Sequence, residues 1–498
     1  MKIQQLGFRL LQLVVLWIVF GAGIGFALNW GHSPTAYAGR QSFFEPKTPG
    51  ALSSMNTLYM VKDILAGSGS SEPTFGVVAN DTLFFVPSNI RPLQLWKSDG
   101  SDAGTSFISF LNNGWFTEGS PVNVGGTVYF MIRNGQQVYE DELWKSDGTI
   151  TGTLKVTNNT ICSTGICLAY AGKTVYFSAK DQEHGLELWK TDGTPEGTVM
   201  VKDINPGSAS SNPLYFYNLN EVIYFGSNDG VHGGELWKTD GTPEGTVMVK
   251  DINPGSASSI PGPYDWSFIM GSQNKLFFTA RTPQAGMELW TSDGTITGTV
   301  MLKDINPGPG DSVAGLLTDL DGTLYFGAND GTAGGEIWKT NGEPQGTEMV
   351  KDIYPGSTGS NPSDMVVLNH FLYFRADDGV HGRELWKSDG SANNTAMVQD
   401  INSDQMGYPY LISSDPMYLT VFHRSLYFVA QYDWHQNTAV YQLDPDSLPT
   451  ALINTKDPRV LAHNGQTKLF FSINDGVHGT ELWALQFPRT IFLPSIMR

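Results

Sequence analysis

Short runs of apolar and aromatic residues alternate with polar turns from residue 57 to residue 487. The stretch 214–256 shows the pattern most clearly and predicts strands at 214–219, 222–227, 234–239 and 246–252. These runs are rich in β-branched and aromatic residues, as strands are. Asp-Gly and Asn-Pro-Gly separate them and favour turns, because Gly takes positive φ and Pro presets φ. No run has helical periodicity over three turns, so we expect an all-β fold.

The four-strand pattern returns with a period of about 48 residues, which is the size of a β-propeller blade. An open β-solenoid is the alternative, but its units are usually shorter. A Trp marks the third strand of each unit, and Tyr441 replaces it in one weak copy. Because this aromatic recurs at the centre of every unit, we expect it to pack in the core between blades rather than to stack on sugars. The repeated Trp residues are Trp96, Trp144, Trp189, Trp237, Trp290, Trp338, Trp386 and Trp483.

The two ends of the repeat region complement each other. Residues 57–64 resemble a fourth strand without the first three, and 460–463, 468–473 and 481–485 resemble three strands without a fourth. Pairing the N-terminal strand with the C-terminal unit closes the ring and removes two sheet edges that invite aggregation. The sequence therefore predicts a β-propeller of nine four-stranded blades, with eight as the next count.

The segments that flank the repeats predict export. Residues 1–38 have a basic start, an apolar run and a small-x-small end at 36–38, as a cleaved signal peptide has. An uncleaved membrane anchor is the alternative, and it is the only membrane contact that we expect. Residues 39–56 are interpreted as a linker. The apolar tail 488–498 is either a sorting or anchoring tag or a strand packed under the propeller. We expect a secreted or cell-envelope protein.

The net charge indicates which classes of partner are unsuitable, and the cysteine content indicates whether a disulfide forms. The net charge is −19 and the pI about 4.8, which argues against nucleic acid, since phosphates need Lys and Arg. An acidic surface is compatible with cation binding but commonly serves solubility alone. The chain has two cysteines, Cys162 and Cys167, and in an exported protein we expect a local disulfide, with two free thiols as the alternative.

The third strand carries a recurring motif, Glu-Leu-Trp-Lys-Ser/Thr-Asp-Gly-Thr, at 142–149, 187–194 and 235–242. It resembles the bacterial repeat family named for its ELWxxDGT motif. The resemblance covers roughly 57–487 and implies an exported protein with propeller-like repeats and no assigned catalytic residues. Variants of the motif lie at 288–295, 336–343 and 384–391, and shortened copies at 94–101 and 481–484.

Two series of Asp recur, one in the loop after the third strand and one at the end of the fourth. Asp caps turns through its own side chain, which explains both series without a ligand. The alternative is calcium, the only cofactor considered, although no loop has the complete spacing of an EF-hand. The candidate ligands are Asp192, Asp240 and Asp293 in the first series and Asp203, Asp251 and Asp304 in the second.

Ligand-stacking candidates are the Trp residues outside the motif, because aromatic faces bind glycans. They are Trp115, Trp266 and Trp434. The recurring His residues are expected to hydrogen-bond a loop carbonyl or a repeated Asp. These are His184, His232, His381, His435 and His478.

No catalytic motif is found: there is no Gly-x-Ser-x-Gly, His-Glu-x-x-His or Walker loop. We therefore assign no catalytic residue and expect a monomeric, non-enzymatic binding or scaffold module for a glycan or surface protein. One alternative is a glycan-active hydrolase or lyase with acids in the central channel, and another is a purely structural surface repeat. Ligand specificity is expected where the units differ, at 112–121, 260–272 and 418–453. Acids found in single units are Glu118, Glu140, Asp141, Asp265 and Asp311.

Overall fold

The computed structural model describes residues 57–111, 115–116, 121–133, 141–160, 168–260, 269–403, 413–433 and 435–487. Within these residues the protein is all-β, and the only helical element is the short 3-10 turn η1 (Pro344–Gly346). No helix in this part of the chain is long and apolar enough to cross a membrane. The all-β expectation is confirmed.

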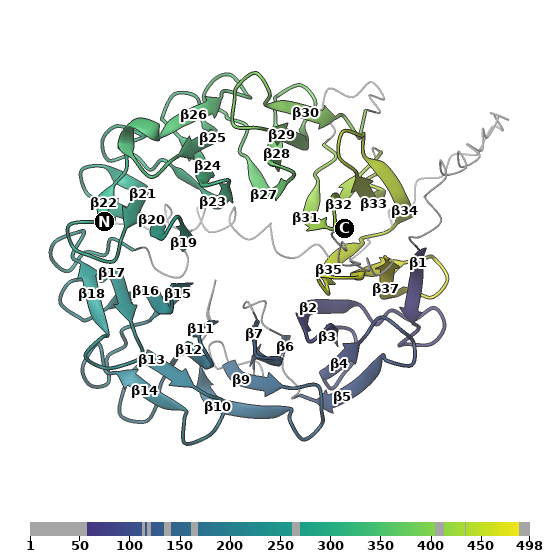
Figure 1. Ribbon diagram of the computed structural model, residues 1–498, viewed down its shortest axis with the longest axis horizontal. Coiled ribbons are helices and arrows are strands. Elements are labelled where there is room, and N and C mark those ends of the chain that lie inside the picture. Colours follow the sequence, from purple (N-terminus) through teal and green to yellow (C-terminus); the bar gives the residue numbers. More distant parts are fainter. Residues whose placement is uncertain are drawn as a thin grey trace, which may run out of the picture. The chain divides into compact units, whose positions relative to one another are not determined.

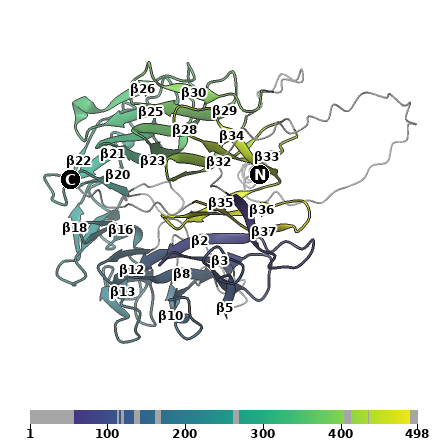
Figure 2. The same ribbon diagram turned by 45° about the vertical axis from the view of Figure 1, so that its right-hand side comes forward.

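Nine four-stranded antiparallel sheets form a ring, so the fold is a nine-bladed β-propeller (Figures 1 and 2). The first strand of each blade lies nearest the centre of the ring, and the fourth lies at the rim (Figure 1). One bridge, Thr160 to Ala179, links the sheets of blades 2 and 3. The predicted fold and blade count are both confirmed.

The strands of the blades are as follows. Blade 1 contains β2 (Pro73–Ala79), β3 (Thr82–Pro87), β4 (Gln94–Ser98) and β5 (Ser106–Phe110). Blade 2 contains β6 (Trp115–Phe116), β7 (Val122–Val124), β8 (Thr127–Arg133), β9 (Asp141–Ser146) and β10 (Leu154–Thr160), and β6 and β7 both pair with β8 in the place of a single first strand. Blade 3 contains β11 (Leu168–Ala171), β12 (Thr174–Ala179), β13 (Glu187–Thr191) and β14 (Val199–Lys202). Blade 4 contains β15 (Leu214–Leu219), β16 (Val222–Asn228), β17 (Gly234–Thr239) and β18 (Val247–Lys250).

The second half of the ring repeats this order. Blade 5 contains β19 (Ile269–Ser272), β20 (Lys275–Thr282), β21 (Gly286–Ser292) and β22 (Val300–Met301). Blade 6 contains β23 (Val313–Leu320), β24 (Thr323–Asn329), β25 (Gly335–Thr340) and β26 (Glu348–Lys351). Blade 7 contains β27 (Ser363–Leu368), β28 (Phe371–Asp377), β29 (Arg383–Ser388) and β30 (Ala396–Gln399). Blade 8 contains β31 (Met417–Phe422), β32 (Ser425–Gln431), β33 (Thr438–Leu443) and β34 (Thr450–Thr455). Blade 9 contains β35 (Arg459–His463), β36 (Lys468–Asn474), β37 (Thr480–Gln486) and β1 (Thr57–Lys62).

Blade 9 joins the two ends of the described chain. Strand β1 pairs antiparallel with β37, with Thr57 opposite Gln486 and Tyr59 opposite Ala484. Both strands thereby gain a partner, and the ring closes without a free edge between first and last blades. The predicted closure is confirmed, although β1 ends at Lys62 rather than at residue 64.

The blades pack on one another through apolar side chains. Between blades 3 and 4, Leu188 and Val201 of one blade contact Phe225 and Trp237 of the next in a single buried cluster. Trp237 is 7% exposed and Phe225 is fully buried. Burying such side chains is worth about 1.5–3 kcal/mol each, so the repeated aromatics hold the ring together. The structure places the repeated Trp positions in this inter-blade core, or at its border in the case of Trp96, Trp144, Trp189 and Trp483.

Polar bonds from the motif add to this packing. The Nζ of Lys190 donates to the Gly241 carbonyl of the next blade at 2.8 Å, and the Nζ of Lys202 donates to the Thr246 carbonyl at 2.7 Å. Gly241 has a φ of +88°, and a Cβ there would lie 2.4 Å from the hydroxyl of Tyr176. The Gly of the Asp-Gly turn is therefore required both by its own backbone and by the neighbouring blade.

Candidate functional site

The motif Glu is a structural residue. Glu235 is buried in β17, and its carboxylate accepts bonds from the amide of Ile252 at 2.9 Å, the amide of Ser259 at 3.1 Å and the hydroxyl of Ser259 at 2.5 Å. Ile252 and Ser259 belong to the connection towards blade 5, so the carboxylate pins this connection to blade 4. Burial raises the pKa of Glu235 to about 7 despite these bonds. The same arrangement occurs at Glu187, Glu288, Glu336, Glu384 and Glu481.

This role was not predicted from the sequence, although a signal exists. A Ser follows the Glu at a separation of 24 residues in blades 3 to 6. The constant spacing indicates that the two residues meet, because a variable linker would not preserve it. The pinning also explains why β18 ends at Lys250, two residues before the predicted end: the amide of Ile252 binds Glu235 instead of a strand.

The first Asp series caps turns. The Oδ1 of Asp240 accepts the amide of Thr242 at 2.9 Å and its hydroxyl at 2.7 Å. The hydroxyl of Thr242 in turn accepts the amide of Gly245 at 2.9 Å. The bonds from Thr242 lower the pKa of Asp240. Asp192 and Asp293 have the same bonds in their own blades.

The second Asp series ends the fourth strands. Asp203 and Asp304 each accept a Gly amide through Oδ2, at 3.1 Å and 3.3 Å. In Asp203, Asp251 and Asp304 the Oδ1 is buried and has no hydrogen-bond partner among the described residues. Each series contributes one Asp to a blade, so members of the same series lie in different blades. In the described part of the chain, no three His, Cys, Asp or Glu residues are grouped so that they could hold a metal ion.

The repeated His residues bind an Asp three residues earlier. The Nδ1 of His232 lies 2.7 Å from Oδ2 of Asp229, and the His232 amide donates to Oδ1 at 2.9 Å. This contact raises the pKa of His232. His184, His381 and His478 make the same pair, whereas His435 donates its amide to Asp433.

Several sequence candidates lie outside the described residues. These are Trp266, Trp434, Cys162, Cys167, Glu118, Glu140 and Asp265, and of Trp115 only the backbone in β6 is described. Two of the acids found in single units are engaged in ion pairs. Asp141 lies 3.1 Å from Arg133, and Asp311 lies 2.6 Å from Arg281.

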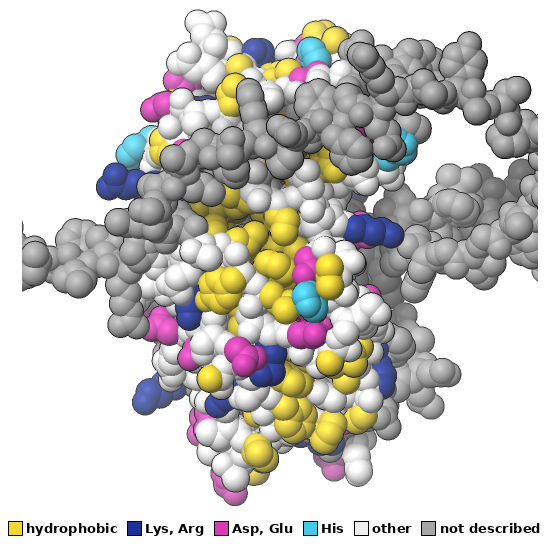
Figure 3. Space-filling view, turned by 90° about the vertical axis from the view of Figure 1, so that its right-hand side faces the viewer, with side chains coloured by type: hydrophobic (Ala, Val, Ile, Leu, Met, Phe, Trp, Pro, Cys, Tyr) yellow, Lys and Arg dark blue, Asp and Glu magenta, His cyan; other side chains and the backbone are white. Residues whose placement is uncertain are grey.

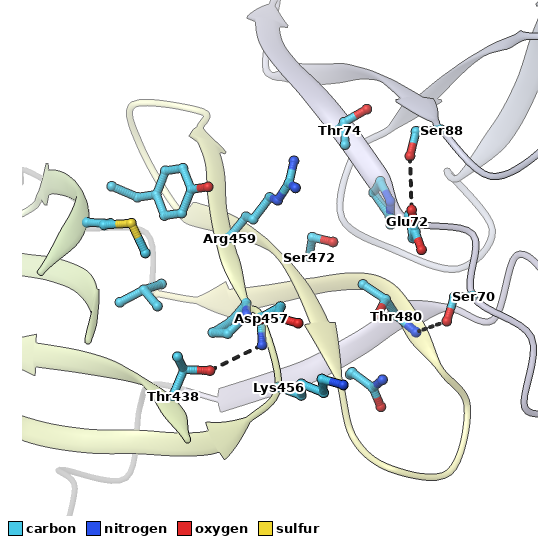
Figure 4. Close-up of a pocket in the computed structure, with 16 residues that line it drawn as sticks. Ser70, Glu72, Thr74, Ser88, Thr438, Lys456, Asp457, Arg459, Ser472 and Thr480 are labelled. Atoms are coloured by element: carbon cyan, nitrogen blue, oxygen red, sulfur yellow. Dashed lines mark hydrogen bonds between the residues drawn. The ribbon is translucent and has the colours of Figure 1, made fainter. Parts of the chain in front are cut away.

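A cavity of about 510 Å³ lies where blades 8, 9 and 1 meet (Figure 4). Its walls come from the connection into β2, the starts of β31 and β35, and the ends of β32 and β36. Pockets of 300–1,000 Å³ are the usual size for small-ligand sites. Figure 3 shows acidic and basic side chains interspersed with hydrophobic ones on the side of the ring that faces right in Figure 1.

The cavity lies where the repeat is broken. In blade 4 the connection begins at residue 251, and its Ile260 packs with Tyr215 and is 4% exposed. A Cβ on Gly226 would lie 2.8 Å from Ile260, so this side chain fills the space beside the second strand. Blade 8 connects to blade 9 through residues 456–458 alone. The residue before the proline, which is Ile260 in blade 4, is the exposed Asp457 here, and the space beside Val429 stays open.

Blade 8 also lacks the pinning carboxylate. Ala439 pairs with Ala430 in the register that Glu235 and Ser227 occupy in blade 4. The short connection is held instead by Thr438, whose hydroxyl accepts the Asp457 amide at 3.1 Å and donates to the Thr455 carbonyl at 2.6 Å. The backbone that carries the cavity wall is therefore fixed.

The charged side chains of the cavity are mostly free. Lys456, Asp457 and Arg459 are exposed, and their side chains have no hydrogen bond or ion pair to any described residue. Glu72 accepts the Ser88 hydroxyl at 3.4 Å. Arg459 extends from the start of β35 into the cavity, with Glu72 and Thr74 on the opposite wall (Figure 4). The cavity thus offers two cations and two carboxylates that do not neutralise each other by contact.

Three of the lining residues have left-handed backbones. The φ values are +50° at Glu72, +57° at Tyr418 and +48° at Asp457. The position of Glu72 is filled by Asn212 and Asn361 in blades 4 and 7, and Asn tolerates this conformation better than Glu. Tyr215 in blade 4 has the same conformation as Tyr418, so these left-handed backbones belong to the repeat rather than to the cavity alone.

Comparisons with known proteins find solved structures of low similarity. No family model and no curated protein matches the chain. Solved structures that resemble it include puromycin hydrolase (14% identity, TM-score 0.35, 74% of this chain and 60% of that chain). Another is the β-propeller domain of the Trilobed protease from Pyrococcus furiosus (11% identity, TM-score 0.35, 67% of this chain and 100% of that chain). A third is a prolyl endopeptidase (12% identity, TM-score 0.38, 75% of this chain and 54% of that chain). At such identities and TM-scores these proteins carry no argument about the activity of this chain.

Proposed function

We propose that this chain is an exported, non-enzymatic binding module of the ELWxxDGT-repeat type. In this proposal the propeller acts at or outside the cell surface and holds a glycan or a protein partner in the cavity between blades 8, 9 and 1. One observation carries the proposal: the repeated Glu, Asp and His residues are engaged by the fold itself, whereas the side chains of Lys456, Asp457 and Arg459 in the cavity bind no described residue.

Of the acids that occur in single blades, the two that the structure describes, Asp141 and Asp311, are paired with arginines. Because no observation favours a catalytic pair, the glycan-active enzyme and the purely structural repeat are outcomes of the test below rather than second proposals.

The test measures binding of the purified protein to arrays of polysaccharides and of surface proteins, with calcium and with chelator. Tyr418→Gly, which removes a cavity wall and suits the positive φ, is expected to abolish binding. Tyr170→Ala is the control, because Tyr170 is also 41% exposed but lies on β11, away from the cavity. Saturable binding lost only in Tyr418→Gly supports the proposal. Progressive shortening of a bound polysaccharide would establish an enzyme, and no binding to either array would favour a structural repeat.

A further inference from the structure

The free cations of the cavity have a specific ligand chemistry. The chain carries a net charge of −19, and Arg133, Arg281 and Arg375 all face carboxylates. Arg459 pairs with no carboxylate of the described residues, although Asp457 and Glu72 line the same cavity. Because its guanidinium pairs with neither of these nearby acids, Arg459 can bind an anionic group of another molecule.

We propose that this cavity recognises the carboxylate of an acidic polysaccharide, with Arg459 as the principal contact and Lys456 as the second. The proposal rests on the proposed binding function and names its ligand class. A guanidinium presents paired N–H donors that match a carboxylate in a bidentate geometry.

The position of Arg459 is fixed before any ligand arrives. Its backbone pairs with Ser472 at the start of β35, the preceding Pro458 is buried, and the amide of Asp457 is held by Thr438. Because the backbone is already ordered, binding costs the side-chain entropy of Arg459 but little backbone entropy.

The other lining groups suit a sugar ring. The carboxylates of Asp457 and Glu72 accept hydroxyl donors, and the ring of Tyr418, 41% exposed, offers an apolar face for stacking. Both carboxylates would repel a multiply charged phosphate, whereas one uronic-acid carboxylate among neutral hydroxyls is compatible with them. Protein interfaces use deeply buried aromatic or Arg anchors surrounded by apolar contacts, whereas Arg459 and Tyr418 are both exposed in this cavity.

The test uses the full chain and matched pairs of polysaccharides. Polygalacturonate, alginate and hyaluronan are each compared with their carboxyl-reduced forms, which keep the sugar backbone and lose the negative charge. The protein is expected to bind at least one acidic form, more weakly at high salt, and not its reduced form. Arg459→Gln is expected to weaken that binding by about 10- to 100-fold, since a hydrogen bond to a charged group is worth about 1.5–3 kcal/mol.

Two controls keep the result interpretable. Arg424→Gln changes an exposed Arg that does not line the cavity and should leave binding unchanged, and the unfolding midpoint of Arg459→Gln should match that of the parent. Binding to reduced or neutral glycans that Tyr418→Gly abolishes and Arg459→Gln does not would overturn this inference and leave the proposed function intact. Absence of binding to every acidic form overturns it as well, and absence of binding to any glycan or protein removes both.

Discussion

Blades 4 and 8 have the same four strands in the same register, yet they differ in what fills the space beside their second strand. In blade 4 a long connection, pinned by Glu235, inserts Ile260. In blade 8 Ala439 stands in place of the pinning Glu, the connection is only residues 456–458, and the space is a cavity. The proposed binding site thus lies beside the blade that lacks the pinning Glu.

The largest losses of stability are expected when Glu235 of blade 4 and Ala439 of blade 8 are each replaced by the residue of the other blade. Glu235→Ala leaves the amides of Ile252 and Ser259 without their buried acceptor and should lower the free energy of unfolding by about 3 kcal/mol or more. Ala439→Glu should destabilise by a similar amount of about 3 kcal/mol, because it buries a carboxylate that no long connection can satisfy. Denaturant unfolding measures both. If either variant unfolds at the parent midpoint, the contrast between the blades does not depend on this residue.

A second comparison separates backbone strain from contact between blades. Gly241→Ala places a Cβ 2.4 Å from the Tyr176 hydroxyl and should cost about 2 kcal/mol or more, from strain and collision together. Gly255→Ala is the matched variant, because its φ is +110° but no atom lies within 4 Å of the new Cβ. It should cost about 1 kcal/mol from the backbone alone. Equal losses in the two variants would show that the neighbouring blade does not require the Gly.

The pinning carboxylates also predict a pH dependence. Burial raises the pKa of Glu235, Glu288 and Glu384 to about 7, above the value of 4.5 expected in the unfolded chain. The folded state therefore binds more protons between about pH 4.5 and 7, and stability falls as the pH rises through this window. The raised pKa of the paired His residues acts in the same direction at higher pH.

Acid has the opposite effect below this window. Although burial raises the pKa of Asp475, the bonds from His478 lower it to about 2, and such Asp residues lose their stabilising bonds when protonated. Thermal unfolding across pH 3–8 should thus show its maximum near pH 5. Glu235→Gln should flatten the decline above that pH. A midpoint that rises from pH 5 to pH 8 would contradict the assignment of buried, proton-binding Glu residues.

The sequence predicted the ring but not the cavity, for physical reasons. Strand type, turn chemistry and repeat period are local properties, and the complementary ends at 57–64 and 460–485 were enough to predict closure. The cavity joins Glu72 to Tyr418 and Arg459, which only closure of the ring brings together. The sequence did mark 418–453 as the degenerate unit, and this unit supplies one wall. The sequence feature that could have indicated the cavity is the short stretch of three residues between Thr455 and Arg459, where other blades have a longer connection.

The smallest stability change is expected at Tyr418, which occupies in blade 8 the position that Tyr215 occupies in blade 4. Tyr215 and Tyr418 occupy the second position of β15 and β31, both with positive φ, but Tyr215 is 7% exposed beside Ile260 and Tyr418 is 41% exposed. Tyr418→Gly relieves the backbone and removes little packing, so its free energy of unfolding should stay within about 1 kcal/mol of the parent. Tyr215→Gly removes a buried ring and should cost about 3 kcal/mol. The two denaturation curves, measured side by side, give the difference directly. A large loss in Tyr418→Gly would mean that this ring supports the fold of blade 8, and the cavity would then lose one of the residues assigned to its ligand.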